Sequence, residues 1–255
     1  MQHFSPKVTV TTGVVALSFF FLARVTGWVG AFFWIAVILA ISFFALYGAP
    51  RVGERERTRY TITIPFFTAI TGFLLLFVLV EKVALRSVIA ALALFVMFAV
   101  LHTLYRSGLP EELRARQLLP PLRMTLYAGV FGWFAASFGV AVMLQIPLWI
   151  LSAPLVLVAG LASWSLLRLA GLDASRAYPA TLALAFLTFE FFWVITFLPV
   201  GYAVQGWLLG GALYVMVQAI MLTAHTTERL EKRSRVRLLA AIVTIIIVAL
   251  LARWV

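Results

Sequence analysis

Apolar runs of about 20 residues constrain the fold of this chain more than any other feature. Hydrophobic residues fill 64% of the 255 positions and charged residues only 11%, whereas a soluble domain carries about 25% charge. So few charges cannot cover a water-facing surface, so most of the chain must lie in lipid. Backbone groups have no water to bond there, which leaves helices or a closed barrel. The runs are continuously apolar rather than alternating, and this pattern excludes a barrel.

The sequence predicts an all-α fold, a single transmembrane helical domain over residues 1–255 with about nine spans. We expect the first run to be a retained span, because it is too long for a signal peptide and no small-residue cleavage site follows it. The expected spans are 8–27, 28–47, 61–80, 87–105, 124–144, 148–167, 179–198, 202–222 and 238–255.

The basic residues predict how the chain is threaded. With nine spans, 16 of the 20 Lys and Arg residues fall on the side of the N-terminus and 4 on the other side. The positive-inside rule therefore places the N-terminus in the cytoplasm and the C-terminus outside. The expected location is a bacterial inner membrane. The expected partners are the bilayer, anionic lipid head groups at the cytoplasmic loops and other membrane proteins. Basic residues placed beside spans argue against nucleic acid.

Prolines mark two features of the predicted topology. In the long loop 106–123, Pro110 with Glu111 and Glu112 is typical of a helix start, and Pro120–Pro121 is expected to end that helix, which would lie on the membrane surface. Pro65 is expected in the first turn of its span, where proline is tolerated.

Glu190 is the ionisable residue nearest the middle of an apolar run. A charged carboxylate in hydrocarbon costs a few kcal/mol, so such a residue suggests function. Two interpretations stay open: a proton or ligand site in a midplane cavity, or a carboxyl that only hydrogen-bonds a neighbouring helix. No Lys or Arg lies at its depth, so the expected partners are neutral polar side chains: Ser137, Thr188, Thr196, Gln205 and Tyr214.

Small residues predict where helices approach closely. Gly206 and Gly210 form a Gly-x-x-x-Gly face in the eighth span. Gly132 and Gly139 belong to a small-residue face in the fifth span, together with Gly129, Ala135 and Ala136. This face predicts a central position for the fifth span.

A short motif in the long loop resembles a catalytic signature. Glu111-Glu112-x-x-x-Arg116 is similar to the EExxxR motif of CPBP intramembrane proteases. That resemblance implies glutamates that activate water and histidines downstream, but only His225 follows here and no Phe-x-x-x-His is present downstream. The three histidines are scattered and cysteine is absent, so we expect no metal. No cofactor motif occurs either, so we expect no cofactor.

A second resemblance covers about a tenth of the chain. The stretch FEFFWVITFLPVGYAVQGWLLGGALYV (189–215) resembles hairpins of uncharacterised polytopic membrane proteins of candidate-phylum bacteria, and it implies no activity. Because the spans are poor in polar residues, the sequence favours a non-catalytic accessory or scaffold subunit of a membrane assembly. Binding or transport of a small or lipid-like solute through Glu190 is the alternative, and an intramembrane hydrolase is a remote one.

Overall fold

The chain is a succession of helices. The computed structural model describes residues 6–24, 28–47, 56–105, 111–224 and 228–252, and within these ranges it contains nine helices and no strand. The all-helical class predicted from the sequence is therefore confirmed. The helices are α1 (Pro6–Arg24), α2 (Trp28–Tyr47), α3 (Glu56–Leu79), α4 (Val83–Tyr105), α5 (Glu111–Leu144), α6 (Leu148–Leu169), α7 (Ala174–Thr196), α8 (Tyr202–Ala224) and α9 (Glu228–Leu251).

Seven of the described helices are long and apolar enough to cross a membrane: α1 and α3 through α8. The other two, α2 and α9, contain shorter apolar stretches, Phe33–Tyr47 and Leu238–Leu251. These lengths support a multi-pass membrane protein. The count of nine spans, the side on which each terminus lies and the identity of the membrane stay predictions.

Prolines lie inside several helices, and this corrects two expectations. Pro120 and Pro121 do not end a surface helix, because α5 runs through both as one helix of 34 residues. Pro65 is not in a first turn either, because α3 begins at Glu56 and Pro65 is its tenth residue. The α6 and α7 helices also contain a proline, Pro154 and Pro179. The helices therefore begin earlier than several of the predicted spans.

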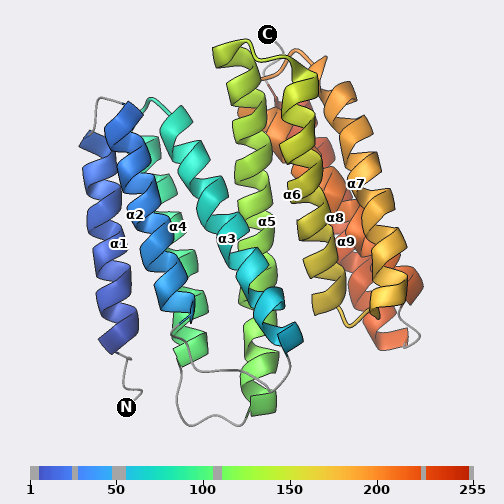
Figure 1. Cartoon of the computed structure of the whole chain (residues 1–255). Helices are drawn as coiled ribbons and strands as arrows, with labels where there is room; N and C mark the ends of the chain where they lie inside the picture. Colours follow the sequence, from blue (N-terminus) through green and yellow to red (C-terminus); the bar gives the residue numbers. More distant parts are fainter. Residues whose placement is uncertain (1–5, 25–27, 48–55, 106–110, 225–227, 253–255) are drawn as a thin grey trace. The chain divides into compact units, whose positions relative to one another are not determined.

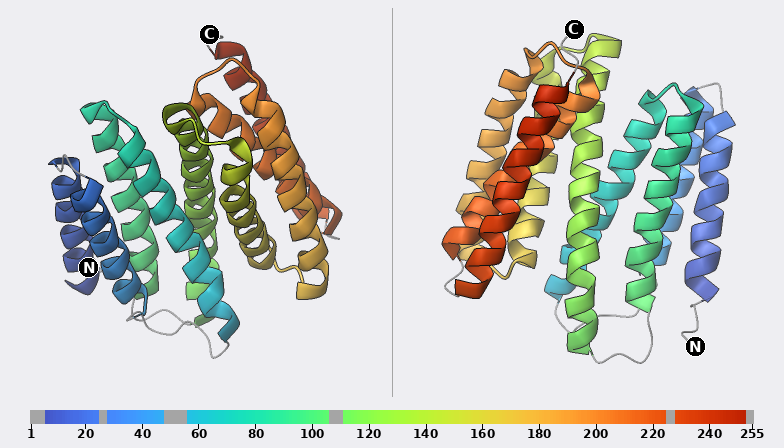
Figure 2. Two further views of the ribbon diagram at one scale, coloured as in Figure 1. Left: turned by 45° about the horizontal axis from the view of Figure 1, so that its top comes forward. Right: turned by 180° about the vertical axis from the view of Figure 1, so that it is seen from behind.

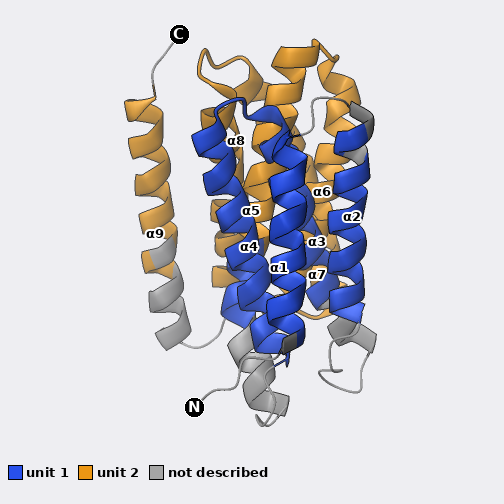
Figure 3. Ribbon diagram, turned by 90° about the vertical axis from the view of Figure 1, so that its left-hand side faces the viewer, with its two compact units in different colours: residues 1–125 blue, residues 126–255 orange. Residues whose placement is uncertain are grey.

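The chain divides into two compact units, Met1–Thr125 and Leu126–Val255 (Figure 3). The division falls inside α5, which begins in the first unit and continues into the second. The prediction of a single transmembrane domain stays a prediction.

In the first unit, α1 packs against both α2 and α4, and α3 packs against α4 and α2 (Figure 2). Aromatic contacts join these helices: the Phe19 and Phe77 rings meet edge-on at 5.4 Å, and Phe21 stacks on Trp34 at 4.9 Å. The hydroxyl of Tyr105 donates a hydrogen bond to the carbonyl of Ala45, 2.7 Å away, and so ties α4 to α2.

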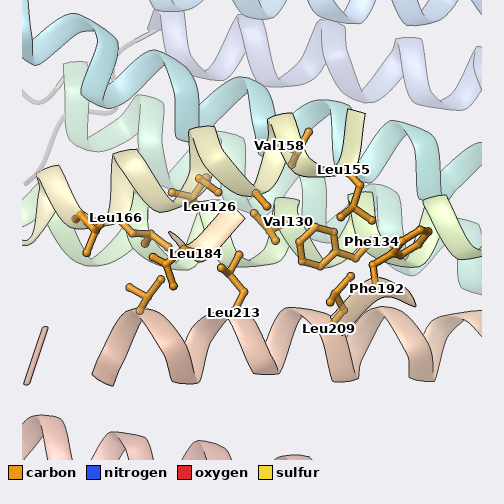
Figure 4. Close-up of a cluster of buried hydrophobic side chains, with 14 of the residues drawn as sticks. Leu126, Val130, Phe134, Leu155, Val158, Leu166, Leu184, Phe192, Leu209 and Leu213 are labelled. Carbon is orange, nitrogen blue, oxygen red and sulfur yellow. The ribbon is translucent and has the colours of Figure 1, made fainter. Parts of the chain in front are cut away.

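In the second unit, consecutive helices pack as antiparallel neighbours: α6 on α7, α7 on α8, and α8 on α9 (Figure 1). Buried side chains of α6, α7 and α8 meet the second half of α5 in one apolar cluster (Figure 4). The Phe138 ring of α5 lies 5.0 Å from the Phe192 ring of α7. The labelled members of the cluster are Leu126, Val130, Phe134, Leu155, Val158, Leu166, Leu184, Phe192, Leu209 and Leu213.

The turn before α7 is fixed by a glycine. Gly171 has φ +91°, a conformation that other residues rarely adopt. The Leu172 amide donates to the Leu167 carbonyl, and the Gly171 amide donates to the Arg168 carbonyl. These two bonds form a Schellman motif that ends α6. Because the turn is short and closed, α7 returns directly along α6.

Candidate functional site

Glu190 lies on the face of α7 that points away from the core of the second unit. The core face of α7 carries Leu184, Ala185, Thr188, Phe192 and Ile195, all buried. Two residues correspond to about 200° around a helix, so Glu190 lies nearly opposite both Thr188 and Phe192. Its side chain is accordingly exposed.

The neighbours of Glu190 on this face are large and apolar. Phe186 and Val194 lie one turn to either side, and Leu187 and Phe197 complete the surface; all four are exposed. We call the surface formed by Phe186, Leu187, Glu190, Val194 and Phe197 the Glu190 face. It places one carboxyl in otherwise apolar surroundings.

Glu190 lies nearer one end of α7 than the sequence predicted. The predicted span, 179–198, put it close to the middle, whereas the helix runs from Ala174 to Thr196. Glu190 is therefore about 9 Å from the end of the helix and roughly 7 Å from its centre. With α7 centred in the bilayer, this depth still lies inside a hydrocarbon layer of about 15 Å half-thickness.

The predicted hydroxyl partners of Glu190 bond to their own helices instead. Thr188 donates to the carbonyl of Leu184 at 2.6 Å, Thr196 to that of Phe192 at 2.7 Å, and Ser137 to that of Trp133 at 2.9 Å. Such bonds to the preceding turn are the usual way to satisfy a hydroxyl inside a helix. These three side chains therefore form no cluster with the carboxyl.

Gln205 has a structural role at the junction of α7 and α8. Its buried amide nitrogen lies 3.1 Å from the carbonyl oxygen of Leu198 and 3.3 Å from that of Ile195. The last carbonyls of a helix have no partner within the helix. Gln205 thus supplies a donor to the end of α7 from the first turn of α8.

Tyr214 is half-buried and faces α5 rather than α7. Its ring meets that of Tyr127 at 4.8 Å and 63°. Among the residues that the structure describes, Glu190 forms no hydrogen bond or ion pair with any of its five predicted partners. The expected polar cluster is therefore corrected, while a functional role for Glu190 itself stays a prediction.

The predicted close approach of small residues is seen at Gly206. A Cβ atom placed on Gly206 would lie 2.5 Å from both the Cα and the backbone nitrogen of Ala135, so α8 touches the backbone of α5 there. A Cβ atom placed on Gly210 would lie 3.9 Å from the Cα of Phe131, which is an ordinary van der Waals distance. Gly132 and Gly139 are buried in α5. Of the two residues in the Gly-x-x-x-Gly face, only Gly206 therefore requires the absence of a side chain.

Sequence reasoning missed several buried polar residues, three of them in the helices of the second unit's core. Gln218 is buried in α8, and Ser163 and Ser165 are buried in α6. The hydroxyls of both serines have no hydrogen-bond partner within the described ranges. The available signal was an amide or hydroxyl inside an apolar run, the same signal that drew attention to Gln205.

Two other kinds of site considered from the sequence are a metal centre and the protease motif. No group of three His, Asp or Glu side chains that could hold a metal occurs in the described part of the chain. Glu111 and Glu112 are the first residues of α5, but their side chains lie outside what the structure describes. The protease resemblance thus stays a prediction.

Comparisons with protein-family models, with curated proteins and with solved structures found no match to this chain. The resemblance of residues 189–215 to polytopic proteins of candidate-phylum bacteria also stays a prediction.

Proposed function

We propose that this chain is a non-catalytic accessory or scaffold subunit of a membrane assembly, and that the Glu190 face is its contact surface. One observation carries the proposal: the carboxyl lies on the outward side of α7, among exposed apolar side chains. Lipid tails offer this group no hydrogen bond, and a polar group left unsatisfied in hydrocarbon costs several kcal/mol. A neighbouring protein helix can provide the missing partner.

The alternative, a transport or binding site for a small solute, would need polar groups that converge on a cavity. The hydroxyls of Thr188, Ser137 and Thr196 instead bond their own helices, and Gln205 bonds the end of α7. These groups do not gather around Glu190, which favours a surface role for the carboxyl. Hydrolysis, the remote alternative, has no described side chain to support it.

For the cellular setting we keep the bacterial inner membrane, with the N-terminus in the cytoplasm. The support is the basic residues, 16 of which would lie on the cytoplasmic side and 4 outside. Anionic head groups would contact the cytoplasmic loops.

The proposal is tested by measuring the size of the assembly in its own lipids. Discs bounded by polymer are expected to contain more polypeptide than one 28.3 kDa chain, once the mass of lipid and polymer is subtracted. Glu190→Leu removes the hydrogen-bonding group and is expected to release free chain. Thr188→Val, on the opposite face of the same helix, is the matched control and should leave the size unchanged. An assembly that is unaffected by Glu190→Leu would contradict the proposal.

A further inference from the structure

We propose that the interface between α6 and α7 holds an internal water molecule, bound between the hydroxyls of Ser163 and Thr181. Both helices belong to the second unit and lie side by side (Figure 1). The proposed site lies inside this unit, so it does not depend on Glu190 or on an external partner.

The hydroxyls of Ser163 and Thr181 differ from others in the same unit. Ser137, Thr188 and Thr196 donate to the preceding turn of their own helix, at 2.6 to 2.9 Å. The hydroxyl oxygens of Ser163 and Thr181 are also buried, but neither has a hydrogen-bond partner among the described residues. A buried hydroxyl without a partner is destabilising, so native proteins nearly always provide one, either from the chain or from ordered water.

Both oxygens are turned to the inside of the unit. Ser163 is fully buried in α6. Thr181 is half-buried in α7, yet its hydroxyl oxygen is inaccessible, so the exposed part of this side chain is not the hydroxyl. Residues four apart share one face of a helix, and Thr181 lies midway between Ala177 and Ala185, which are both buried. The Thr181 hydroxyl therefore lies on the core face of α7.

One contact between the helices places the two hydroxyls opposite each other. A Cβ atom placed on Gly160 of α6 would lie 3.8 Å from the Cβ of Ala185 in α7, so these two positions face one another. Because α7 returns antiparallel along α6, Ser163 and Thr181 lie on the same side of this contact, three residues after Gly160 and four residues before Ala185. At 1.5 Å per residue, their distances along the helices differ by only about 1.5 Å. Each also lies within about 60° of the contact direction around its own helix.

Water is the ligand that suits two facing hydroxyls. A serine or threonine hydroxyl has one donor and two acceptor sites, and a water molecule can donate to one oxygen while it accepts from the other. Buried waters in proteins typically bind polar groups that are otherwise unsatisfied. The buried side chains of α6 and α7 include no charged residue. A neutral ligand therefore fits this interface better than an ion.

A structure of the full chain at a resolution that shows ordered water tests the site directly. We expect a water oxygen within about 3 Å of both the Ser163 Oγ and the Thr181 Oγ1. The same map of Ser163→Ala should lack this water. Hydroxyls that bond each other, or that bond carbonyls of their own helices, would overturn the proposal. The map of the parent chain decides this even where a variant fails to fold.

A double-mutant cycle, measured by unfolding in detergent, tests whether the two hydroxyls share one ligand. Ser163→Ala and Thr181→Val are each expected to lower the folded-to-unfolded ratio by about fivefold. Because both substitutions remove the same bridge, the double variant should lose clearly less than the product of the two, about 25-fold. A loss equal to that product would overturn the proposal.

Ser165 provides the matched control for this cycle. It is also a buried serine of α6 whose hydroxyl has no partner among the described residues. It lies about 140° around the helix from Gly160, and so away from Thr181. Ser165→Ala combined with Thr181→Val should therefore give the product of the two single effects. Equal coupling in the two pairs would show that the bridge is not specific to Ser163, and the proposal would be wrong.

Discussion

The two faces of α7 are built from similar apolar residues but treat polar groups in opposite ways. On the core face, Thr188 is fully buried and bonds the Leu184 carbonyl of its own helix. On the outer face, Glu190 is exposed and has no hydrogen bond within the described residues. A hydroxyl can be satisfied by the preceding turn, whereas a carboxyl has too much hydrogen-bonding capacity for that. The difference suggests that polar groups inside the second unit serve its structure and that Glu190 serves an external contact.

The largest expected change in the free energy of unfolding comes from truncating a phenylalanine on the core face of α7, compared with one on its outer face. Phe192 is fully buried against Phe138, so Phe192→Ala should lower the free energy of unfolding by about 3 kcal/mol through the cavity it leaves. Phe186→Ala, on the outer face, should change it by less than about 0.5 kcal/mol. Denaturation in detergent, at a dilution that keeps the chain monomeric, measures both. Equal losses would mean that the two faces are not distinct.

A smaller loss of unfolding free energy is expected from a substitution where α8 touches α5. Gly206→Ala would place a methyl group 2.5 Å from the Ala135 backbone, which cannot move aside as a side chain can. We expect a loss of about 1 to 3 kcal/mol from this overpacking. Gly210→Ala has ordinary contact distances and should be neutral or stabilising by up to about 1 kcal/mol. The same denaturation assay compares the two, and a tolerated Gly206→Ala would show that the crossing is looser than described.

The smallest expected loss of stability is at Gln205. This variant separates residues that stabilise the chain from residues that contact a partner. Gln205→Leu removes the donor to the carbonyls of Ile195 and Leu198 at the junction of α7 and α8, and should lower stability by about 1 kcal/mol. It should leave the size of the membrane assembly unchanged, in contrast to Glu190→Leu. Loss of the assembly without loss of stability would instead place Gln205 in a functional site.

The helices were predictable from the sequence, but the orientation of Glu190 was not. Uninterrupted apolar runs specify helices in lipid, and the α2 and α8 helices begin at the predicted residues, Trp28 and Tyr202. The core and the lipid are both apolar, so hydrophobic periodicity does not reveal which side of a membrane helix faces inward. Small residues carry only part of that information: Ala177, Ala185 and Thr188 are buried on the core face of α7, but Ala183, two turns before Glu190, is exposed. Their spacing therefore did not settle the orientation of Glu190.

The close approach at Gly206 was predictable from the Gly-x-x-x-Gly spacing, although Gly210 in the same pair makes only ordinary contact. The extent of α5 was not. A proline pair usually ends a helix, yet α5 continues through Pro120 and Pro121. Composition alone does not show whether the missing backbone bonds can be replaced by other partners.

The prolines inside the helices also bear on how deeply the helices lie in the bilayer. Each one lacks an amide hydrogen, so the carbonyl four residues earlier has no helical donor and depends on another source, most readily water. For Pro154 and Pro179 these carbonyls belong to Ile150 and Ser175, in the first turns of α6 and α7. For Pro65 the carbonyl belongs to Thr61, just before the apolar span that starts at Ile62. Where water supplies that donor, these early turns of α3, α6 and α7 limit how deeply the chain can sink into a bilayer.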